Sequence, residues 1–203
     1  MRDPHELADS TEVGVKGSIV RAVVTVLTDQ GFCDAVSARV SPGARALLLD
    51  PPVATRWIDA RLQNEIYQAL LDLVGSDKLR RINRTALERG LSPLLRASAE
   101  RVLRIFGASP AALLSKLDRV AGSTARGVVY SYVEIDAGSG HFDIEYPTLH
   151  EVPLGPFVAT SGALELIFDL CGVRGTCGAP VPVANGKHNR MRFHISWREV
   201  TRG

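Results

Sequence analysis

The sequence lacks the features that mark several large protein classes. Its 203 residues include only three cysteines, Cys33, Cys171 and Cys177. They are too few and too scattered for a disulfide framework, so a reducing, cytoplasmic compartment is expected. No apolar run approaches the ~20 residues that span a bilayer, and the polar N-terminus does not resemble a signal peptide. A formal charge of +2 does not indicate a nucleic-acid-binding or membrane-surface protein, and no nucleic-acid partner is expected.

Motifs for phosphate binding and nucleophilic catalysis are also missing. Neither a P-loop nor a dinucleotide-binding fingerprint occurs. Ser161 does not lie in the strand–turn–helix context of a nucleophile elbow, and Cys33 has no histidine near it in the sequence. The sequence therefore predicts a protein that is not an enzyme and that needs no cofactor.

Helical patterns fill the chain from Gly17 to Gly122. Apolar residues recur at three- and four-residue spacing after Gly17, and again from Ile58 to Leu73, where Gly75 closes the pattern. Ser76-Asp77 can cap a further helix. Two later segments, 92–107 and 109–122, each open with Ser-Pro and close with Gly, which is typical of a helix start and stop.

Strand patterns begin after Gly122. Residues 127–135 and 141–146 predict a hairpin, and 157–170 returns to helical spacing before Gly172. Residues 173–184 form a weak, Pro-interrupted strand. Asn185-Gly186 signals a turn before a strand that alternates apolar and polar residues over 191–197. The predicted fold class is α+β, with a helical layer packed on a four-stranded antiparallel β-β-α-β-β sheet. Residues 1–15 are expected to form a flexible acidic tail and 16–203 a single domain.

Several short motifs carry a family resemblance. They are Val15-Lys16-Gly17-Ser18 before an apolar helix, Trp57 opening a helix that contains Tyr67, the Gly107-Ala108-Ser109-Pro110 junction, and Arg192–Trp197. This order resembles an uncharacterised family expanded as paralogs in myxobacteria (DUF2378-like). That family is similar to a fold group of heme nitric-oxide-binding domains, vinyl-reductase-like domains and TRAPP subunits. The resemblance implies a pocket between helices and sheet, which holds heme, an apolar small molecule or nothing in different relatives.

Heme is not expected, because the resemblance places its proximal histidine in the helical half. Residues 76–122 contain no His, and neither Tyr nor Cys occurs between Gly75 and Gly122.

An apolar small molecule is the alternative occupant of this pocket. Aromatic residues would line it, and the competing interpretation is that they simply fill the core. The candidates are Trp57, Phe106, Tyr130, Tyr132, Phe142, Phe157, Phe168 and Trp197.

Charge is polarised along the chain. The charged residues of 78–104 are eight basic and two acidic ones, whereas residues 128–171 contain seven acidic residues and no Lys or Arg. Pairing between the two segments, within one molecule or between two molecules, would give both sets of charges a partner. The candidate interface residues are Arg80, Arg81, Arg84, Glu134, Asp136, Asp143 and Glu145. For the four acids, the solvated face of a sheet is the competing explanation.

A metal site is not expected. Cys171, Cys177, His188 and His194 are weak candidates, because their spacing is wider than that of usual structural zinc sites. Taken together, the sequence predicts a non-enzymatic signalling or adaptor domain that binds a partner protein, as a homodimer. A small-molecule sensor with an apolar ligand is the alternative.

Overall fold

The computed structural model describes residues 13–90, 109–148, 150–183 and 189–199. The predicted helix over 92–107 and the Asn185-Gly186 turn lie outside these residues, and so does most of the predicted tail. The helices are α1 Gly17–Asp29, α2 Cys33–Ser37, α3 Pro42–Leu49, α4 Ala60–Gly90, α6 Pro110–Leu114, α7 Leu117–Ala121 and α8 Leu154–Cys171. The strands are β1 Gly14–Lys16, β2 Trp57–Asp59, β3 Ala125–Arg126, β4 Val129–Asp136, β5 Ser139–Glu145, β6 Val173–Cys177, β7 Val181–Pro182 and β8 Arg190–Glu199.

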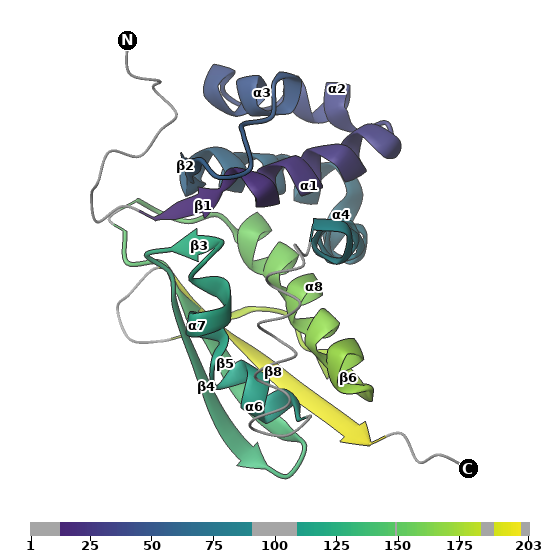
Figure 1. The fold of residues 1–203 in the computed structure, drawn as a ribbon, viewed down its shortest axis with the longest axis vertical. Helices are drawn as coiled ribbons and strands as arrows, with labels where there is room; N and C mark the ends of the chain where they lie inside the picture. Colours follow the sequence, from purple (N-terminus) through teal and green to yellow (C-terminus); the bar gives the residue numbers. More distant parts are fainter. Residues whose placement is uncertain (1–12, 91–108, 149, 184–188, 200–203) are drawn as a thin grey trace.

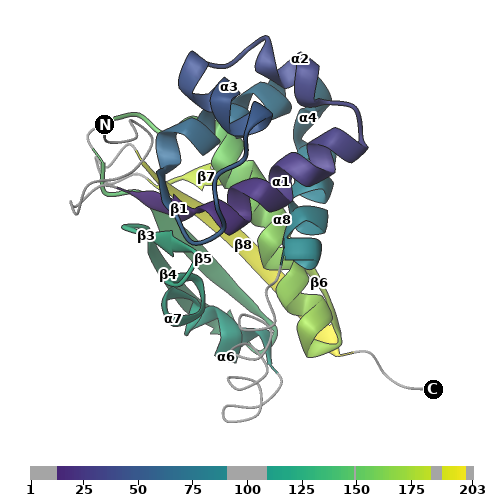
Figure 2. The same ribbon diagram turned by 45° about the horizontal axis from the view of Figure 1, so that its top comes forward.

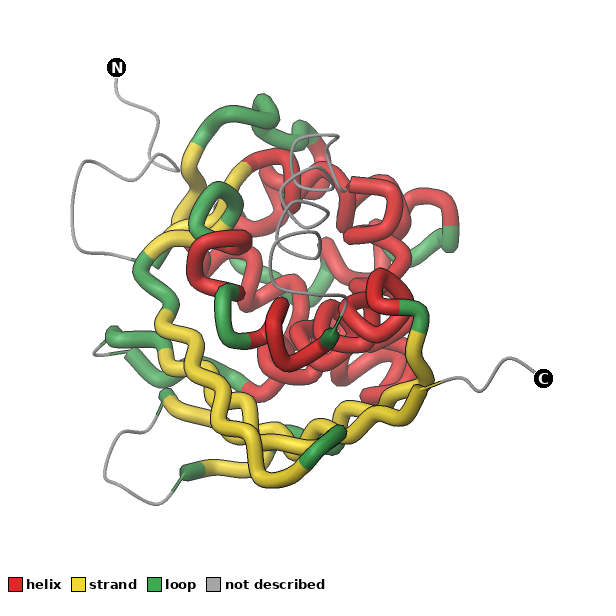
Figure 3. The backbone as a smooth tube through the Cα atoms, turned by 60° about the horizontal axis from the view of Figure 1, so that its bottom comes forward, coloured by secondary structure: helices red, strands yellow, loops and turns green. Residues whose placement is uncertain are grey.

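The main sheet is antiparallel and curves around the helices, which lie on one of its faces (Figure 3). Its strand order is β4-β5-β8-β6, and β7 also pairs with β8. The sheet therefore has five strands, not the four predicted. The Pro-interrupted segment after Gly172 splits into β6 and β7, and both pair with the ten-residue strand β8.

A second, three-stranded sheet of order β2-β1-β3 was not predicted. Lys16 pairs with Trp57 in β2, and Gly14 pairs with Arg126 in β3. These strands have two or three residues each, too few to produce a visible alternation in sequence. Two expectations change as a result. Trp57 belongs to a strand rather than opening a helix, and Gly14 and Val15, the last described residues of the predicted tail, belong to β1.

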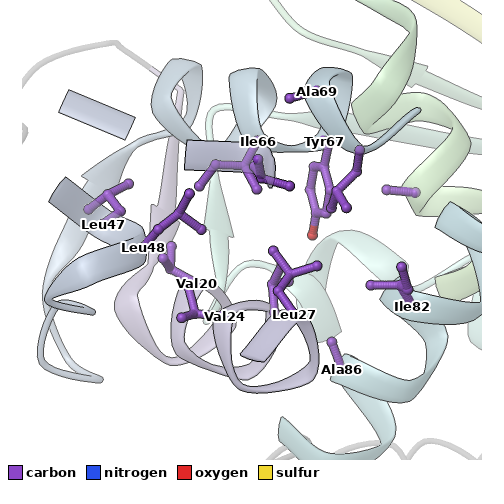
Figure 4. Close-up of a cluster of buried hydrophobic side chains, with 14 of the residues drawn as sticks. Val20, Val24, Leu27, Leu47, Leu48, Ile66, Tyr67, Ala69, Ile82 and Ala86 are labelled. Atoms are coloured by element: carbon purple, nitrogen blue, oxygen red, sulfur yellow. The ribbon is translucent and has the colours of Figure 1, made fainter. Parts of the chain in front are cut away.

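Helix α4 is bent sharply at Gly75, whose φ of 75° and ψ of 172° are not helical. The sequence predicts two helices separated at this glycine, and the backbone break confirms the separation. The two halves pack with α1 and α3 around one apolar cluster, in which Ile66, Tyr67 and Ile82 face Leu27 (Figure 4).

Helix α8 lies between α4 and the main sheet (Figures 1 and 2). It approaches α4 closely because Gly162 has no side chain; an added Cβ would collide with the carbonyl oxygen of Arg80. Gly172 ends the helix with a φ of 67°, as predicted for a C′ glycine. Among the described residues, only α8 has the length and composition to cross a membrane, and 56% of it is buried inside the fold.

The face of α8 toward the sheet belongs to a second apolar cluster. Phe142, Phe157, Phe193 and Ile195 are fully buried there. The alternation predicted for the last strand is confirmed, since Phe193 and Ile195 point inward while His194 is exposed.

Candidate functional site

An inner cavity of about 240 Å³ lies between the two apolar clusters. It is bounded by α1, α4, α7 and α8, by the short strands β1 and β3, and by the ends of β4 and β5. The described residues that line it are Val13, Gly14, Val15, Ile19, Ala60, Gln63, Asn64, Tyr67, Asn83, Leu87, Leu117, Val120, Ala121, Thr124, Ala125, Val128, Tyr130, Tyr146, Pro156, Thr160, Ala163, Leu164, Leu166, Ile167 and Leu170. None of these described lining residues is Lys, Arg, His, Asp or Glu, so the described part of this wall is uncharged.

The polar side chains on this wall are largely engaged with one another. Gln63 Nε2 donates to the Tyr67 hydroxyl at 2.8 Å, and that hydroxyl donates to Asn83 Oδ1 at 2.7 Å. Asn83 Nδ2 in turn donates to the carbonyl oxygen of Ala159 on α8 at 2.7 Å. This chain of hydrogen bonds fixes the helical side of the cavity, because a broken link would leave a buried polar group unpaired.

Tyr130 and Tyr146 provide hydroxyl groups from the sheet side. Burial raises the pKa of Tyr130, and the neighbouring Tyr146 and Asp118 raise it further. Burial also raises the pKa of Tyr146, to about 12, although a hydrogen bond with Thr160 offsets part of this increase. Both phenols are therefore neutral at physiological pH. The Tyr130 hydroxyl has no hydrogen-bond partner among the described residues, so it is available to a ligand.

An outer cavity of about 500 Å³ adjoins the inner one. The two share Val13, Ala60, Asn64 and Tyr146. The remaining described residues of the outer cavity are Asp59, Arg61, Glu65, Pro147, Thr148, His150, Glu151, Val152 and Pro153. The outer cavity thus has charged side chains in its described lining, which the described lining of the inner cavity lacks.

Most of the aromatic residues predicted to line a pocket lie elsewhere. Tyr130 lines the inner cavity, and Phe106 lies outside the described residues. Phe142 and Phe157 are fully buried in the core between α8 and the sheet. Tyr132, Phe168 and Trp197 pack together, with Trp197 at 6.4 Å from Tyr132 and 6.5 Å from Phe168 between ring centroids.

Trp57, the last of the predicted pocket residues, belongs to β2. Lys16 Nζ lies 4.1 Å from the centroid of its indole ring, and Arg126 Cζ lies 4.9 Å from it. These are cation–π contacts within the three-stranded sheet.

The predicted interface residues of α4 form pairs inside this chain. Arg80 bonds the carboxylate of Glu165 and donates to the Cys177 carbonyl oxygen at 3.0 Å. Arg84 pairs with Asp169 and, at 3.1 Å, with Glu88. The partners Glu165 and Asp169 lie on α8 rather than on the sheet, because α8 packs directly against α4. Arg81 is exposed.

The acidic residues predicted on the sheet do not form one cluster. Asp143 is buried and accepts hydrogen bonds from Arg192 Nε and Nη2 at 2.7 and 2.8 Å, and from Arg190 Nη2 at 2.7 Å. Glu145 of β5 lies opposite Arg190 of β8 in the strand register. Glu134 and Asp136 are exposed at the end of the β4–β5 hairpin, where Ser139 Oγ donates to Asp136 at 2.7 Å.

The weak metal candidates are not brought together among the described residues. Cys177 is buried and pairs in register with Ile195, on the inner face of the sheet. His194 is on the outer face, with its ring 5.8 Å from that of His141. His188 lies outside the described residues. Within the part of the chain that the structure describes, no group of three metal-ligating side chains occurs.

Sequence reasoning missed Gln63, Asn64 and Asn83, which are all buried. A signal was present: Gln63 and Asn64 share the face of α4 that carries Ile66, Tyr67 and Leu70. Polar amides on an apolar helix face require partners, and such residues point to a buried network or a ligand.

Comparison with known proteins identifies the fold but not a family. No family model and no curated protein matches the chain. The solved structure of an Fe(II) unliganded H-NOX protein from K. algicida aligns with a TM-score of 0.63 and 11% identity, over 93% of this chain and 99% of that one. An oxygen-binding H-NOX domain related to soluble guanylate cyclases aligns at 0.55 and 14% identity, over 93% and 97%. A structure concerned with heme redox potential and porphyrin distortion aligns at 0.57 and 14% identity, over 93% and 98%.

These neighbours confirm the predicted fold group and correct one prediction. The chain has the fold of H-NOX domains, while the resemblance to the myxobacterial family finds no matching model and stays a prediction. The expectation of no heme is contradicted, because the structures that share this fold are H-NOX domains and include one concerned with heme.

Heme in the inner cavity would need a side chain that serves as an axial ligand to its iron. An axial ligand is usually His, Cys, Met or Tyr, and the described lining has no His, Cys or Met. Tyr67, Tyr130 and Tyr146 are the oxygen donors present, and burial raises the pKa of each, which disfavours the tyrosinate that would bind iron. The described donor set does not fit a heme iron.

Proposed function

We propose that this protein is a small-molecule sensor domain that binds a compact, largely apolar ligand in the inner cavity and performs no chemistry on it. The observation that carries this proposal is a cavity of about 240 Å³ between helices and sheet, whose described lining residues carry no charge. An apolar cavity of about 150 Å³ in another protein binds benzene, so this volume is sufficient for a somewhat larger molecule. The free hydroxyl of Tyr130 would orient a polar atom of the ligand.

The position of the cavity supports a sensing role. Its walls come from α4 on one side and from β4, β5 and α8 on the other, so a ligand would contact both layers of the fold. A ligand that binds one arrangement of these layers more tightly shifts the population toward it. The network from Gln63 through Tyr67 and Asn83 to Ala159 joins the same two layers and would transmit such a shift.

A small-molecule sensor was the alternative hypothesis from the sequence, and the H-NOX-like fold supports it better than the adaptor hypothesis. Partner-protein binding, homodimer formation and the absence of enzymatic activity stay predictions. The three free cysteines among the described residues support the expected reducing, cytoplasmic location.

Ligand binding can be tested with 1-naphthol and with hemin. Calorimetric titration of 1-naphthol should give a saturable heat, and the melting temperature should rise, because a ligand at 100 times its Kd stabilises the folded state by about 2.7 kcal/mol. Hemin titration followed by its Soret absorbance tests the ligand that the fold group suggests. If neither compound binds the wild-type protein, the sensor proposal is wrong.

A matched pair of variants localises the binding. Ala163 lines the inner cavity on α8, and Ala163→Phe would fill it. Ala46→Phe makes the same change on α3, where the alanine is partly exposed and lines neither cavity. We expect Ala163→Phe to abolish 1-naphthol binding and Ala46→Phe to retain it. Equal affinity in both variants would place the ligand elsewhere.

A further inference from the structure

We propose that the inner and outer cavities form one site for an amphipathic molecule, with its apolar body in the inner cavity and a cationic, hydrogen-bond-donating head in the outer cavity. The inference rests on the proposed function and adds the chemical class of the ligand. A simple member of this class is an alkylamine.

The two cavities meet at a narrow set of residues. Ala60 and Asn64 on α4, together with Tyr146 after β5, line both of them. A molecule longer than the inner cavity would therefore extend past Asn64 and Tyr146 into the outer cavity.

Asn64 is a polar residue of the junction whose side chain faces both cavities. Its side chain is only 7% exposed, yet its amide has no hydrogen-bond partner among the described residues. The neighbouring Gln63, in contrast, donates to the Tyr67 hydroxyl. A ligand donor at the junction would satisfy Asn64 Oδ1.

The charges of the outer cavity indicate the sign of the head group. Its described lining has three carboxylates, Asp59, Glu65 and Glu151, against one guanidinium, Arg61. Arg61 Nε donates to Asp59 Oδ2 at 2.7 Å, so the two compensate each other.

Glu65 and Glu151 remain on this wall, with the imidazole of His150. Glu65 Oε2 accepts a hydrogen bond from the backbone N–H of Ser41 at 2.9 Å, and Glu151 is exposed. Both carboxylates can accept from a ligand cation, and both would repel a ligand carboxylate.

Three ligands of equal chain length test the head group: octylamine, octanol and octanoate, titrated calorimetrically at pH 7.5. At this pH the amine is a cation and the acid an anion. We expect octylamine to bind about tenfold tighter than octanol, and octanoate to bind weakest, since charge-assisted hydrogen bonds are roughly twice as strong as neutral ones. Octanoate binding as tightly as octylamine would overturn the proposal.

Variants test the residues. Glu65→Gln/Glu151→Gln removes two charges and keeps acceptors, so octylamine should lose about tenfold in affinity while octanol binding changes little. Asp34→Asn/Asp77→Asn makes the same charge change at exposed residues that line neither cavity, and should not alter either affinity.

Asn64→Leu should weaken the binding of both octylamine and octanol without destabilising the free protein. A less stable Asn64→Leu protein with unchanged affinities would overturn the role of Asn64.

The outcomes separate this inference from the proposed function. If 1-naphthol or hemin binds and none of the octyl compounds does, the amphipath proposal is wrong and the sensor proposal stands. If none of the five compounds binds, both are wrong.

Discussion

The Tyr67 hydroxyl donates a hydrogen bond of 2.7 Å to Asn83 Oδ1, although sixteen residues of α4 separate the two. In a straight helix these residues would lie about 24 Å apart along the axis. The bend at Gly75 brings them together, and Asn83 then reaches α8 through the Ala159 carbonyl. One network therefore joins the two halves of α4, the inner cavity and α8.

Tyr67→Phe should destabilise the protein by about 1–3 kcal/mol, because it leaves the buried Asn83 Oδ1 and Gln63 Nε2 without a partner. Urea unfolding followed by circular dichroism measures the change. Thr25→Val, which removes an exposed hydroxyl that bonds only the Arg21 carbonyl, is the control and should change stability by less than about 0.5 kcal/mol. Equal effects of the two substitutions would mean that the network contributes nothing.

Gly75 should not tolerate any side chain, because its φ of 75° and ψ of 172° belong to a region that essentially only glycine occupies. We expect Gly75→Ala and Gly75→Asn to cost about 1–3 kcal/mol each. Gly172 is the comparison: its φ of 67° and ψ of 28° are left-handed helical, where Asn is accepted more readily than Ala. Gly172→Asn should therefore be less damaging than Gly172→Ala in the same unfolding assay. A well-tolerated Gly75→Asn would contradict this account of the bend.

Asp143 should contribute stability that acid removes. Burial alone would raise the pKa of this carboxyl, but the hydrogen bonds from Arg192 and Arg190 outweigh it and hold the pKa below its usual value. The contribution is thus complete above the ordinary Asp pKa of about 3.9 and is lost as the pH falls through the lower, folded-state pKa.

Asp143→Asn tests this expectation. It should cost about 1–3 kcal/mol at pH 7, and the difference from wild type should shrink below about pH 4. Glu134→Gln, at an exposed position of β4, should cost less than about 0.5 kcal/mol. A difference between Asp143→Asn and wild type that does not depend on pH would contradict the ion-pair account.

Two of the three thiols should be unreactive in the folded protein. Burial raises the pKa of Cys171 to about 11 and that of Cys177 to about 12, and only the thiolate reacts. In a Cys33→Ser variant, which isolates these two, modification by Ellman's reagent at pH 8 should be at least roughly a hundredfold slower than in guanidinium. Rapid labelling of the folded variant would contradict the raised pKa values of these two thiols.

Local patterns were sufficient for the order of the longer helices and strands. The alternation around Phe193 and Ile195 identified β8, Gly172 identified the end of α8, and Gly75 marked the break in α4. Each of these signals lies within a few residues, where backbone geometry and side-chain periodicity act directly. The β1–β3 sheet escaped prediction because its short strands depend on partners about 40 to 110 residues away in the chain.

The candidate site depended far more on tertiary packing. The sequence proposed eight aromatic residues for a pocket, and of those only Tyr130 lines the described inner cavity. Aromatic side chains such as Phe142 and Phe157 instead fill the core, because burying large apolar surface is where they stabilise the fold most. The partners of Arg80 and Arg84 on α8, 85 positions away in each case, were likewise decided by which helices pack together.

By itself, the sequence determined the α+β class, the helical half followed by the strand-rich half, and the glycines at which helices end or bend, since these follow from local spacing and backbone freedom. Only the tertiary structure decided that Gln63, Asn64 and Asn83 face a cavity, that the described lining of this cavity is uncharged, and that a charged cavity adjoins it at Asn64. A cavity is space left where several elements fail to fill a volume, and no local pattern in one segment records what its distant neighbours leave empty.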